Sequence, residues 1–292
     1  MSDIMIDSPQ HITPELREWI VAQAASGQPP QAMVDSMVAS GWHKDVALAS
    51  LQKVLSEHLA REAARAEEDN LQPAVPVPEP ALAESPLYLD AGDRRVHVLQ
   101  AMTDPRLVVF GSLLGDDECD ALIAAARPRM ARSLTVATDE RGEAPNDDRT
   151  SSGMFFERGE NEIVARIEAR IARLVHWPVE NGEGLQILRY APGAQYRPHY
   201  DYFDPDEPGT QTILKRGGQR VATLVMYLGE PEKGGGTTFP NVHLQVAPKR
   251  GNAVFFSYER PDPSTFTLHG GAPVIAGEKW IATKWLRERE FK

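Results

Sequence analysis

Apolar residues recur every three or four positions through the first sixty residues, which predicts short helices there. Thr13 stands before Pro14, and Gly27 ends the first apolar repeat. A threonine caps a helix N-terminus, proline suits its first turn, and glycine stops it. The repeat resumes in "QAMVDSMVASG" and "HKDVALASLQKVL", and the charged helical stretch "SEHLAREAARAEEDN" follows. The pattern predicts a small module of three helices around its own apolar core.

Prolines interrupt this pattern in "LQPAVPVPEPALAESP", which holds Pro73, Pro76, Pro78, Pro80 and Pro86. A proline-rich run is extended and semi-rigid, which is typical of a linker. We therefore expect three parts: a helical module at residues 1–69, a linker at 70–86, and a larger domain at 87–292.

Short strand-like runs dominate the larger domain. Examples are "LQILRY", "RVATLVMYL", "NAVFFSY" and "KWIATKWL", which are separated by Gly, Pro, Asp and Asn. Two stretches, "DDECDALIAAARPRM" and "NEIVARIEARIARLV", have helical periodicity instead. The pattern predicts a mostly β fold, a barrel or sandwich with helices packed on its outside.

Composition narrows the class of partner. The formal charge of -11 and the pI of about 5.3 argue against nucleic-acid binding, because such binding rests on basic side chains that neutralise phosphates. With Cys119 as the single cysteine, an intrachain disulfide is excluded, which suits a reducing cytoplasm. The sequence shows no basic segment followed by an apolar run at its start and no apolar stretch of about 18 residues. We expect a cytoplasmic protein without a membrane span.

The stretch "YRPHYDYF" places His199 and Asp201 two residues apart. On a strand, such residues point to the same face, although a His-x-Asp pair also fits a hydrogen-bonded surface pair. A third candidate ligand, His269, is followed by two glycines that leave it uncrowded. Two histidines and one carboxylate form the facial triad of non-haem Fe(II) oxygenases, which leaves three positions for a bidentate co-substrate and O2.

Lys279 lies in the apolar run "EKWIATKW". A buried ammonium is costly unless it meets an anion, and the carboxylate of a keto acid is the obvious candidate. The alternative, a solvated lysine on an edge strand, fits Lys284 better than Lys279.

Six motifs carry a resemblance to a known family: "RTSSGMFF", "LQILRYAPGAQYRPHYDYF", "RVATLVMYL", "GGGTTFPN", "GNAVFFSY" and "LHGGAPVIAGEKWIATKWL". In their order and spacing, residues from about 107 to 290 resemble the prolyl 4-hydroxylase branch of the Fe(II)/2-oxoglutarate dioxygenases. The resemblance implies a double-stranded β-helix, or jelly-roll, with iron in its mouth.

The resemblance also assigns roles. It implies that His199, Asp201 and His269 bind iron and that Lys279 pairs with the far carboxylate of 2-oxoglutarate. Co-substrate contacts are implied for Tyr190 and Thr237, and peptide-facing positions for Tyr196, Arg220 and Trp285. For the last three, a core role or a surface charge is the alternative.

Arg287 stands where peptidyl-proline enzymes often carry a histidine, which indicates an altered substrate side. We expect Arg287 to bind the substrate, with its guanidinium meeting an acidic group or backbone carbonyls near the proline. The polar stretch "ATDERGEAPNDDRTSS", with Asp147, Asp148 and Arg149, is interpreted either as a flap over the site or as a solvated surface loop.

The expected reaction is hydroxylation of a prolyl residue in a peptide or protein, coupled to oxidative decarboxylation of 2-oxoglutarate to succinate. It requires Fe(II), 2-oxoglutarate and O2, with ascorbate as a further candidate cofactor. Asp201 favours hydroxylation over halogenation, since related halogenases lack this carboxylate. Two alternatives stay open: the same chemistry on a free amino acid or small metabolite, and a non-catalytic barrel. In the second alternative the N-terminal helices, which resemble a UBA-like module, would bind a protein partner.

Overall fold

The computed structural model describes residues 10–132, 134–136, 143–145 and 150–292. The chain divides into two compact units, Met1–Leu71 and Gln72–Lys292. The division falls two residues beyond the end expected for the helical module.

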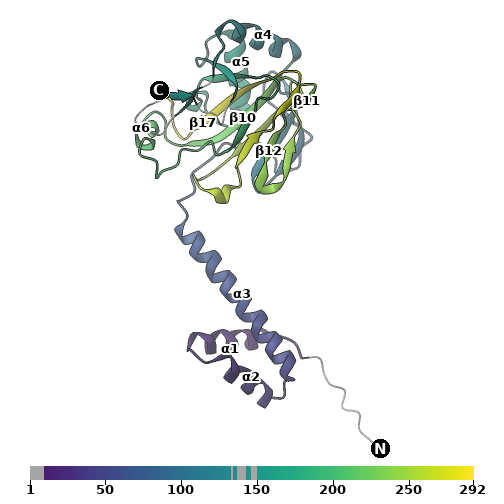
Figure 1. Cartoon of the computed structure of the whole chain (residues 1–292), viewed down its shortest axis with the longest axis vertical. Helices are drawn as coiled ribbons and strands as arrows, with labels where there is room; N and C mark the ends of the chain where they lie inside the picture. Colours follow the sequence, from purple (N-terminus) through teal and green to yellow (C-terminus); the bar gives the residue numbers. More distant parts are fainter. Residues whose placement is uncertain (1–9, 133, 137–142, 146–149) are drawn as a thin grey trace, which may run out of the picture. The chain divides into compact units, whose positions relative to one another are not determined.

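From residue 10 onward, where the structure describes it, the N-terminal unit contains three helices, α1 (Pro14–Ala25), α2 (Pro30–Ala39) and α3 (Lys44–Asn70). Thr13 caps α1, its side chain accepting a hydrogen bond from the Leu16 backbone N–H at 3.2 Å, and Gly27 beyond its end adopts a φ of 80°. The predicted start and stop are therefore confirmed. Helix α3 continues through the whole charged stretch (Figure 1). The core of this unit comprises Ile20, Met33, Val34, Met37, Ala47, Leu51 and Val54.

The C-terminal unit is built from antiparallel sheets, as the sequence predicts. Among the described residues, its major sheet has nine strands in the order β1 (Tyr88–Asp90), β2 (Arg95–Met102), β3 (Arg106–Gly111), β14 (Ala253–Ser257), β10 (Arg220–Gly229), β17 (Lys279–Arg287), β8 (Leu185–Tyr190), β7 (Ser152–Phe156), β4 (Ala131–Arg132). Its minor sheet has the order β13 (Leu244–Val246), β12 (Thr237–Phe239), β15 (His269–Gly271), β9 (Tyr196–His199). The C-terminal unit also contains two short two-stranded sheets: β11 (Lys233–Gly234) with β16 (Val274–Ala276), and β5 (Leu134–Val136) with β6 (Glu143–Pro145).

Two apolar clusters lie on the two faces of the major sheet. One fills the interior between the sheets, where Val225 and Tyr227 of β10 meet Phe239 of β12. The other packs the outer face against α4 (Asp116–Ala126) and α5 (Glu162–Leu174), which lie together above the sheet in Figure 1. This is the predicted jelly-roll with flanking helices. The shorter elements are α6 (Thr210–Leu214) and the 3-10 turns η1 (Arg127–Arg129), η2 (Val179–Asn181), η3 (Pro240–Val242) and η4 (Pro263–Thr265).

Within the described part of the chain, no helix is both long enough and apolar enough to span a bilayer.

Strand alternation decides which side chains of β17 reach the interior. Lys279, Ile281, Thr283 and Trp285 line an interior pocket, whereas the residues between them face the helices. Lys284 is one of the helix-facing residues: it is 2% exposed and its Nζ lies 2.5 Å from Glu168 of α5. The expectation of a solvated Lys284 is therefore wrong, because burial and an ion pair replace solvent at this position.

The proline-rich segment packs on the β domain from Gln72 onward. The Val75 N–H donates to the Glu259 carbonyl at 2.8 Å, and the Glu79 N–H donates to the Val175 carbonyl at 3.0 Å. Pro78 is buried, and Leu82 packs against the outer cluster. The segment is thus part of the larger unit and not a free spacer.

We expect these contacts to make two fragments differ in stability. A fragment that begins at Gln72 retains them, whereas one that begins at Ser85 loses two backbone hydrogen bonds and the apolar contacts of Pro78 and Leu82. The shorter fragment should be less stable by on the order of 3 kcal/mol in urea unfolding. Equal midpoints and slopes for the two fragments would show that residues 72–84 contribute nothing.

Candidate metal centre and co-substrate pocket

The two candidate histidines face each other across paired strands. His269 of β15 lies opposite His199 of β9 in the register of the minor sheet. This pairing needs Gly270, because a Cβ there would lie 2.9 Å from the backbone oxygen of Tyr196. Asp201 lies in a bend just past the end of β9, not on a strand as expected, yet its carboxylate points to the same place.

Candidate ligand atoms of His199, Asp201 and His269 all lie within 4.8 Å of one another. The His199 Nε2 is 3.6 Å from Asp201 Oδ1, and the His269 Nε2 is 3.4 Å from Asp201 Oδ2. Two ligands at right angles, each about 2.1 Å from an octahedral ion, lie about 3.0 Å apart. The three side chains therefore fit one ion without a large rearrangement.

Backbone hydrogen bonds prepare both imidazoles to bind a metal. His199 Nδ1 lies 2.9 Å from the Arg197 carbonyl, and His269 Nδ1 lies 3.0 Å from the Thr267 carbonyl. A carbonyl oxygen can only accept, so each Nδ1 carries the proton. Each Nε2 then keeps a free lone pair near the Asp201 carboxylate. This is the tautomer that binds a metal.

Burial gives the triad its electrostatic character. It lowers the pKa of His269 to about 4, so this imidazole is neutral at neutral pH. The close contact of His269 with Asp201 is therefore not an ion pair but a contact between two candidate metal ligands. Burial works to raise the pKa of Asp201, but the charge that His269 carries at acidic pH, the hydrogen bond with His199 and the Arg220 guanidinium together hold it well below its ordinary value. The site thus offers two imidazole nitrogens and one carboxylate, the donor set of the facial triad.

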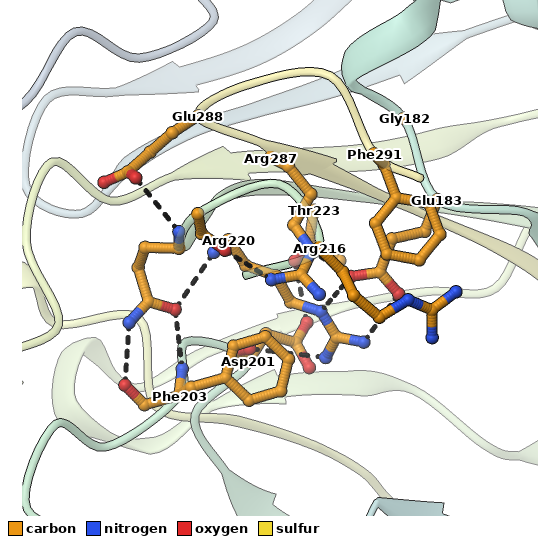
Figure 2. A network of polar contacts seen from close by, with 12 residues as sticks. Gly182, Glu183, Asp201, Phe203, Arg216, Arg220, Thr223, Arg287, Glu288 and Phe291 are labelled. Carbon is orange, nitrogen blue, oxygen red and sulfur yellow. Dashed lines mark hydrogen bonds and ion pairs between the residues drawn. The ribbon is translucent and has the colours of Figure 1, made fainter. Parts of the chain in front are cut away.

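A network of side chains surrounds Asp201 (Figure 2). The Thr223 hydroxyl donates to Asp201 Oδ2 at 2.7 Å, and the Arg220 Nη1 donates to the Asp201 backbone carbonyl at 3.3 Å. Arg220 is itself fixed by a two-point contact with Glu183, at 2.7 and 2.9 Å. Its guanidinium stacks on Trp285, with its central carbon 3.9 Å from the ring centroid.

Lys279 brings a charge into the same pocket. It is 3% exposed, and burial lowers its pKa to about 8. Among the described residues it has no ion-pair or hydrogen-bond partner; its ammonium lies 5.6 Å from the Tyr190 ring centroid and 5.8 Å from that of Tyr227. A buried cation that no described residue neutralises fits a site for an anionic ligand.

Hydroxyl groups flank this ammonium. Tyr190 of β8 pairs with Lys279 in the register of the sheet, and Thr237 lines the same pocket. The Tyr227 hydroxyl donates to Thr237 Oγ1 at 2.8 Å, so the Thr237 proton remains available for a ligand. Together these groups can hold the distal carboxylate of 2-oxoglutarate while its keto-acid end reaches the triad.

The predicted substrate residues fall into two groups. Tyr196 and Trp285 line the pocket, and the Tyr196 ring stacks on His199 with centroids 3.7 Å apart. Arg220 and Arg287 do not line it. Arg220 uses its donors on Glu183 and on the Asp201 backbone, which gives it a structural task instead of an open guanidinium.

Arg287 differs most from its expected place. It is 2% exposed, its Nε lies 2.7 Å from Glu183 Oε1, and its Nη1 donates to the Gly218 carbonyl. Burial lowers its pKa to about 10, so it remains a cation at neutral pH. Its acidic partner is therefore Glu183 of the same chain, and the structure does not support a direct contact between Arg287 and substrate.

Sequence reasoning missed four residues of the site: Glu183, Thr223, Tyr227 and Tyr258. Alternation along "RVATLVMYL" carried a signal for two of them, because Thr223 and Tyr227 share the inward face with Val225. Glu183 lies in a loop and Tyr258 just past β14, so no periodicity marks either one.

The proposed flap cannot be placed on this site. Residues 137–142 and 146–149, which include Asp147, Asp148 and Arg149, lie outside the described residues. A larger cavity of about 750 Å³ lies elsewhere, between residues 79–83 and the strands β3 and β14. Among the described residues, the one cluster suited to a metal is the triad, so the chemistry belongs to the smaller pocket.

Comparison with known proteins agrees with this geometry. Residues 185–287 match the family model of the 2OG-Fe(II) oxygenase superfamily. Prolyl 4-hydroxylase 5 of Arabidopsis thaliana is 43% identical over 222 residues, covering 69% of this chain and 74% of the relative. Prolyl 4-hydroxylase 2 of the same plant is 40% identical over 218 residues, covering 66% and 71%. The crystal structure of a viral collagen prolyl hydroxylase from Paramecium Bursaria Chlorella virus-1 is 33% identical, covering 62% of this chain and 95% of that one, with a TM-score of 0.48.

The fold, the His-Asp-His triad and the matching family model define an Fe(II)- and 2-oxoglutarate-dependent dioxygenase, which uses O2 as its oxidant. Within that superfamily, the chain belongs to the prolyl 4-hydroxylases.

The triad predicts one Fe(II) per chain. His199→Ala or His269→Ala removes one of three ligands and should abolish stoichiometric binding in an anaerobic titration, together with succinate formation. His243→Ala, which alters an exposed histidine outside the triad, is the matched control and should bind normally. Wild-type stoichiometry in either ligand variant would refute the assignment.

Lys279 predicts a pH-dependent affinity for 2-oxoglutarate. The protonated ammonium binds the carboxylate, so affinity should fall as pH rises through the lysine pKa of about 8. At pH 9 only about a tenth of such lysines stay protonated, which predicts a dissociation constant roughly tenfold higher than at pH 7. Anaerobic titration of the metal-loaded protein measures it.

Lys279→Met should weaken this binding by about 2–5 kcal/mol and remove its dependence on pH between 7 and 9, with Fe(II) binding intact. A pH dependence that survives in Lys279→Met would assign it to another group.

Proposed function

We propose that this chain hydroxylates a prolyl residue in a peptide or protein, coupled to oxidative decarboxylation of 2-oxoglutarate to succinate. The observation that carries the proposal is the buried Lys279 ammonium beside the His-Asp-His triad, which has no ion-pair or hydrogen-bond partner among the described residues, in a chain of the prolyl 4-hydroxylase family. When bound, Fe(II) supplies O2 activation. The residues of the chain supply position, charge and protection from water.

Each residue group has a separate task in this proposal. His199, Asp201 and His269 hold the metal, and their fixed tautomers and buried surroundings keep the donor atoms ready. Lys279, Thr237 and Tyr190 hold the co-substrate: the ammonium neutralises its distal carboxylate and the hydroxyls orient it. Because these groups are buried, the distal carboxylate of the co-substrate is shielded from bulk water.

Aromatic rings supply the substrate side. Tyr196 and Trp285 line the same pocket as the triad, so their faces can pack against a pyrrolidine ring that is brought to the metal. Arg220 and Glu183 support this surface from behind, since Arg220 stacks on Trp285 and is held by Glu183. In this proposal Arg220 and Arg287 act by holding the pocket wall.

Two further proposals concern the role of the N-terminal unit and the cellular location of the protein. The N-terminal unit is proposed to be a UBA-like interaction module with a protein partner, supported by three helices around a separate apolar core. A cytoplasmic setting is proposed on the single, buried and unpaired Cys119.

Trp285 offers a test of the substrate assignment. Trp285→Phe removes part of the aromatic wall and should lower kcat/KM for a proline peptide by about tenfold, equivalent to about 1.4 kcal/mol. Succinate formation without peptide should change little. Trp280→Phe is the matched control, because Trp280 lies on the same strand with its ring in the outer cluster. Peptide hydroxylation is measured by mass spectrometry as a gain of one oxygen.

Two results would contradict the assignment. If Trp285→Phe and Trp280→Phe lower peptide turnover equally, Trp285 does not face the substrate. If free amino acids are hydroxylated efficiently while proline peptides of varied flanking sequence are untouched, the small-molecule alternative replaces this proposal.

A further inference from the structure

We propose that Thr223 and Tyr258 are positioning residues for the metal ligand Asp201, and that they hold its carboxylate through a chain of two hydroxyl groups. The inference rests on the assignment of Asp201 as a ligand in the function proposed above. The Thr223 Oγ1 lies 2.7 Å from Asp201 Oδ2, and the Tyr258 hydroxyl lies 3.0 Å from the same Thr223 Oγ1. Thr223 is 0% exposed and Tyr258 is 1% exposed, so solvent does not compete for these bonds.

The donor in each of these two hydrogen bonds can be assigned by counting protons. An ionised carboxylate only accepts, so the single Thr223 proton must go to Asp201. Thr223 Oγ1 can then only accept from the Tyr258 hydroxyl. The direction is therefore Tyr258 to Thr223 to Asp201, and each donor polarises the next.

The two hydroxyl groups fix the rotation of the Asp201 carboxylate, which the other contacts of Asp201 leave free. Arg220 bonds the backbone carbonyl of Asp201, not its carboxylate, so it places the residue without orienting the carboxylate plane. The Thr223 bond to Oδ2 supplies that orientation. It keeps one oxygen occupied by a proton donor and presents the carboxylate to the triad in one rotational position.

Thr223 is well placed to hold a fixed position. It lies in the middle of β10, opposite Phe256 of β14 on one side and Trp285 of β17 on the other. A β-branched side chain on a central strand has little rotamer freedom. Tyr258 follows β14 directly and its ring is buried among Tyr202 and Phe256. Both hydroxyls are therefore carried by rigid parts of the barrel, as a preorganised metal site requires.

The ordinary alternative is that Thr223 only satisfies a buried acceptor. In that case its loss would lower the stability of the fold and leave metal affinity alone. The two roles separate in a direct measurement of Fe(II) affinity, made anaerobically by competition with a chelator on the full chain, with unfolding by urea measured in parallel.

Thr223→Val keeps the shape and removes the hydroxyl, and we expect it to weaken Fe(II) binding by about 10- to 100-fold. Thr223→Ser restores the donor and should return affinity close to that of the wild type. Tyr258→Phe should give a smaller loss, because Thr223 can still donate. The control is Thr210→Val, which removes an equally buried hydroxyl whose bond, at 2.6 Å, goes to the Asp204 carbonyl. It should change stability without changing Fe(II) affinity.

Five outcomes decide the matter. Affinity in the order wild type and Thr223→Ser, then Tyr258→Phe, then Thr223→Val supports the proposal. Unchanged Fe(II) affinity in Thr223→Val, equal losses in Thr223→Val and Thr210→Val, or failure of Thr223→Ser to restore affinity would each overturn it. If the wild-type chain binds no Fe(II) at all, the assignment of Asp201 as a ligand fails first, and this inference fails with it.

Discussion

Charges buried in the barrel interior are the constraint on which the rest of the structure depends. An ion removed from water must meet an opposite charge or a set of hydrogen-bond donors. Glu183 meets two guanidinium groups, from Arg220 and Arg287, and Asp201 meets the Thr223 hydroxyl and faces two imidazoles. Lys279 alone has no such partner among the described residues. Lys279 and the Asp201 carboxylate with its two neighbouring imidazoles therefore form a site that a metal ion and a dianionic ligand would complete.

Strand geometry explains how these charges come to share one pocket. Alternation along β17 sends Lys279 and Trp285 inward and Lys284 outward, where Glu168 of α5 pairs with it. Alternation along β10 sends Thr223 and Tyr227 to the same interior. The minor sheet closes the barrel from the other side and brings His269 opposite His199. The major sheet thus supplies Lys279, Tyr190 and the support for Asp201, and the minor sheet supplies Thr237 and the two histidines.

Much of this could be predicted from the sequence, and the exceptions share a physical cause. Periodicity predicted the helices and the β class, and residue type with the family motifs gave the triad and Lys279. The lysine at 284 was misjudged because a strand pattern does not reveal that a helix with a glutamate covers its outer face. Arg287 was expected to meet substrate because its partner, Glu183, lies about a hundred residues away in a loop. The proline run looked like a spacer, since its composition says nothing of the carbonyl groups that anchor Val75 and Glu79. In all three cases the partner lies far away in the sequence, so the local sequence pattern does not reveal it.

The central claim is that the triad and Lys279 couple succinate formation to hydroxylation of a peptidyl proline. The most direct measurement is to supply ¹⁸O2 with 2-oxoglutarate and a proline peptide, and to weigh both products. The account predicts one ¹⁸O in each molecule of hydroxylated peptide, up to one in each succinate, and equal amounts of the two. Succinate that forms at the same rate with and without peptide, or hydroxylated peptide that carries no ¹⁸O, would contradict it.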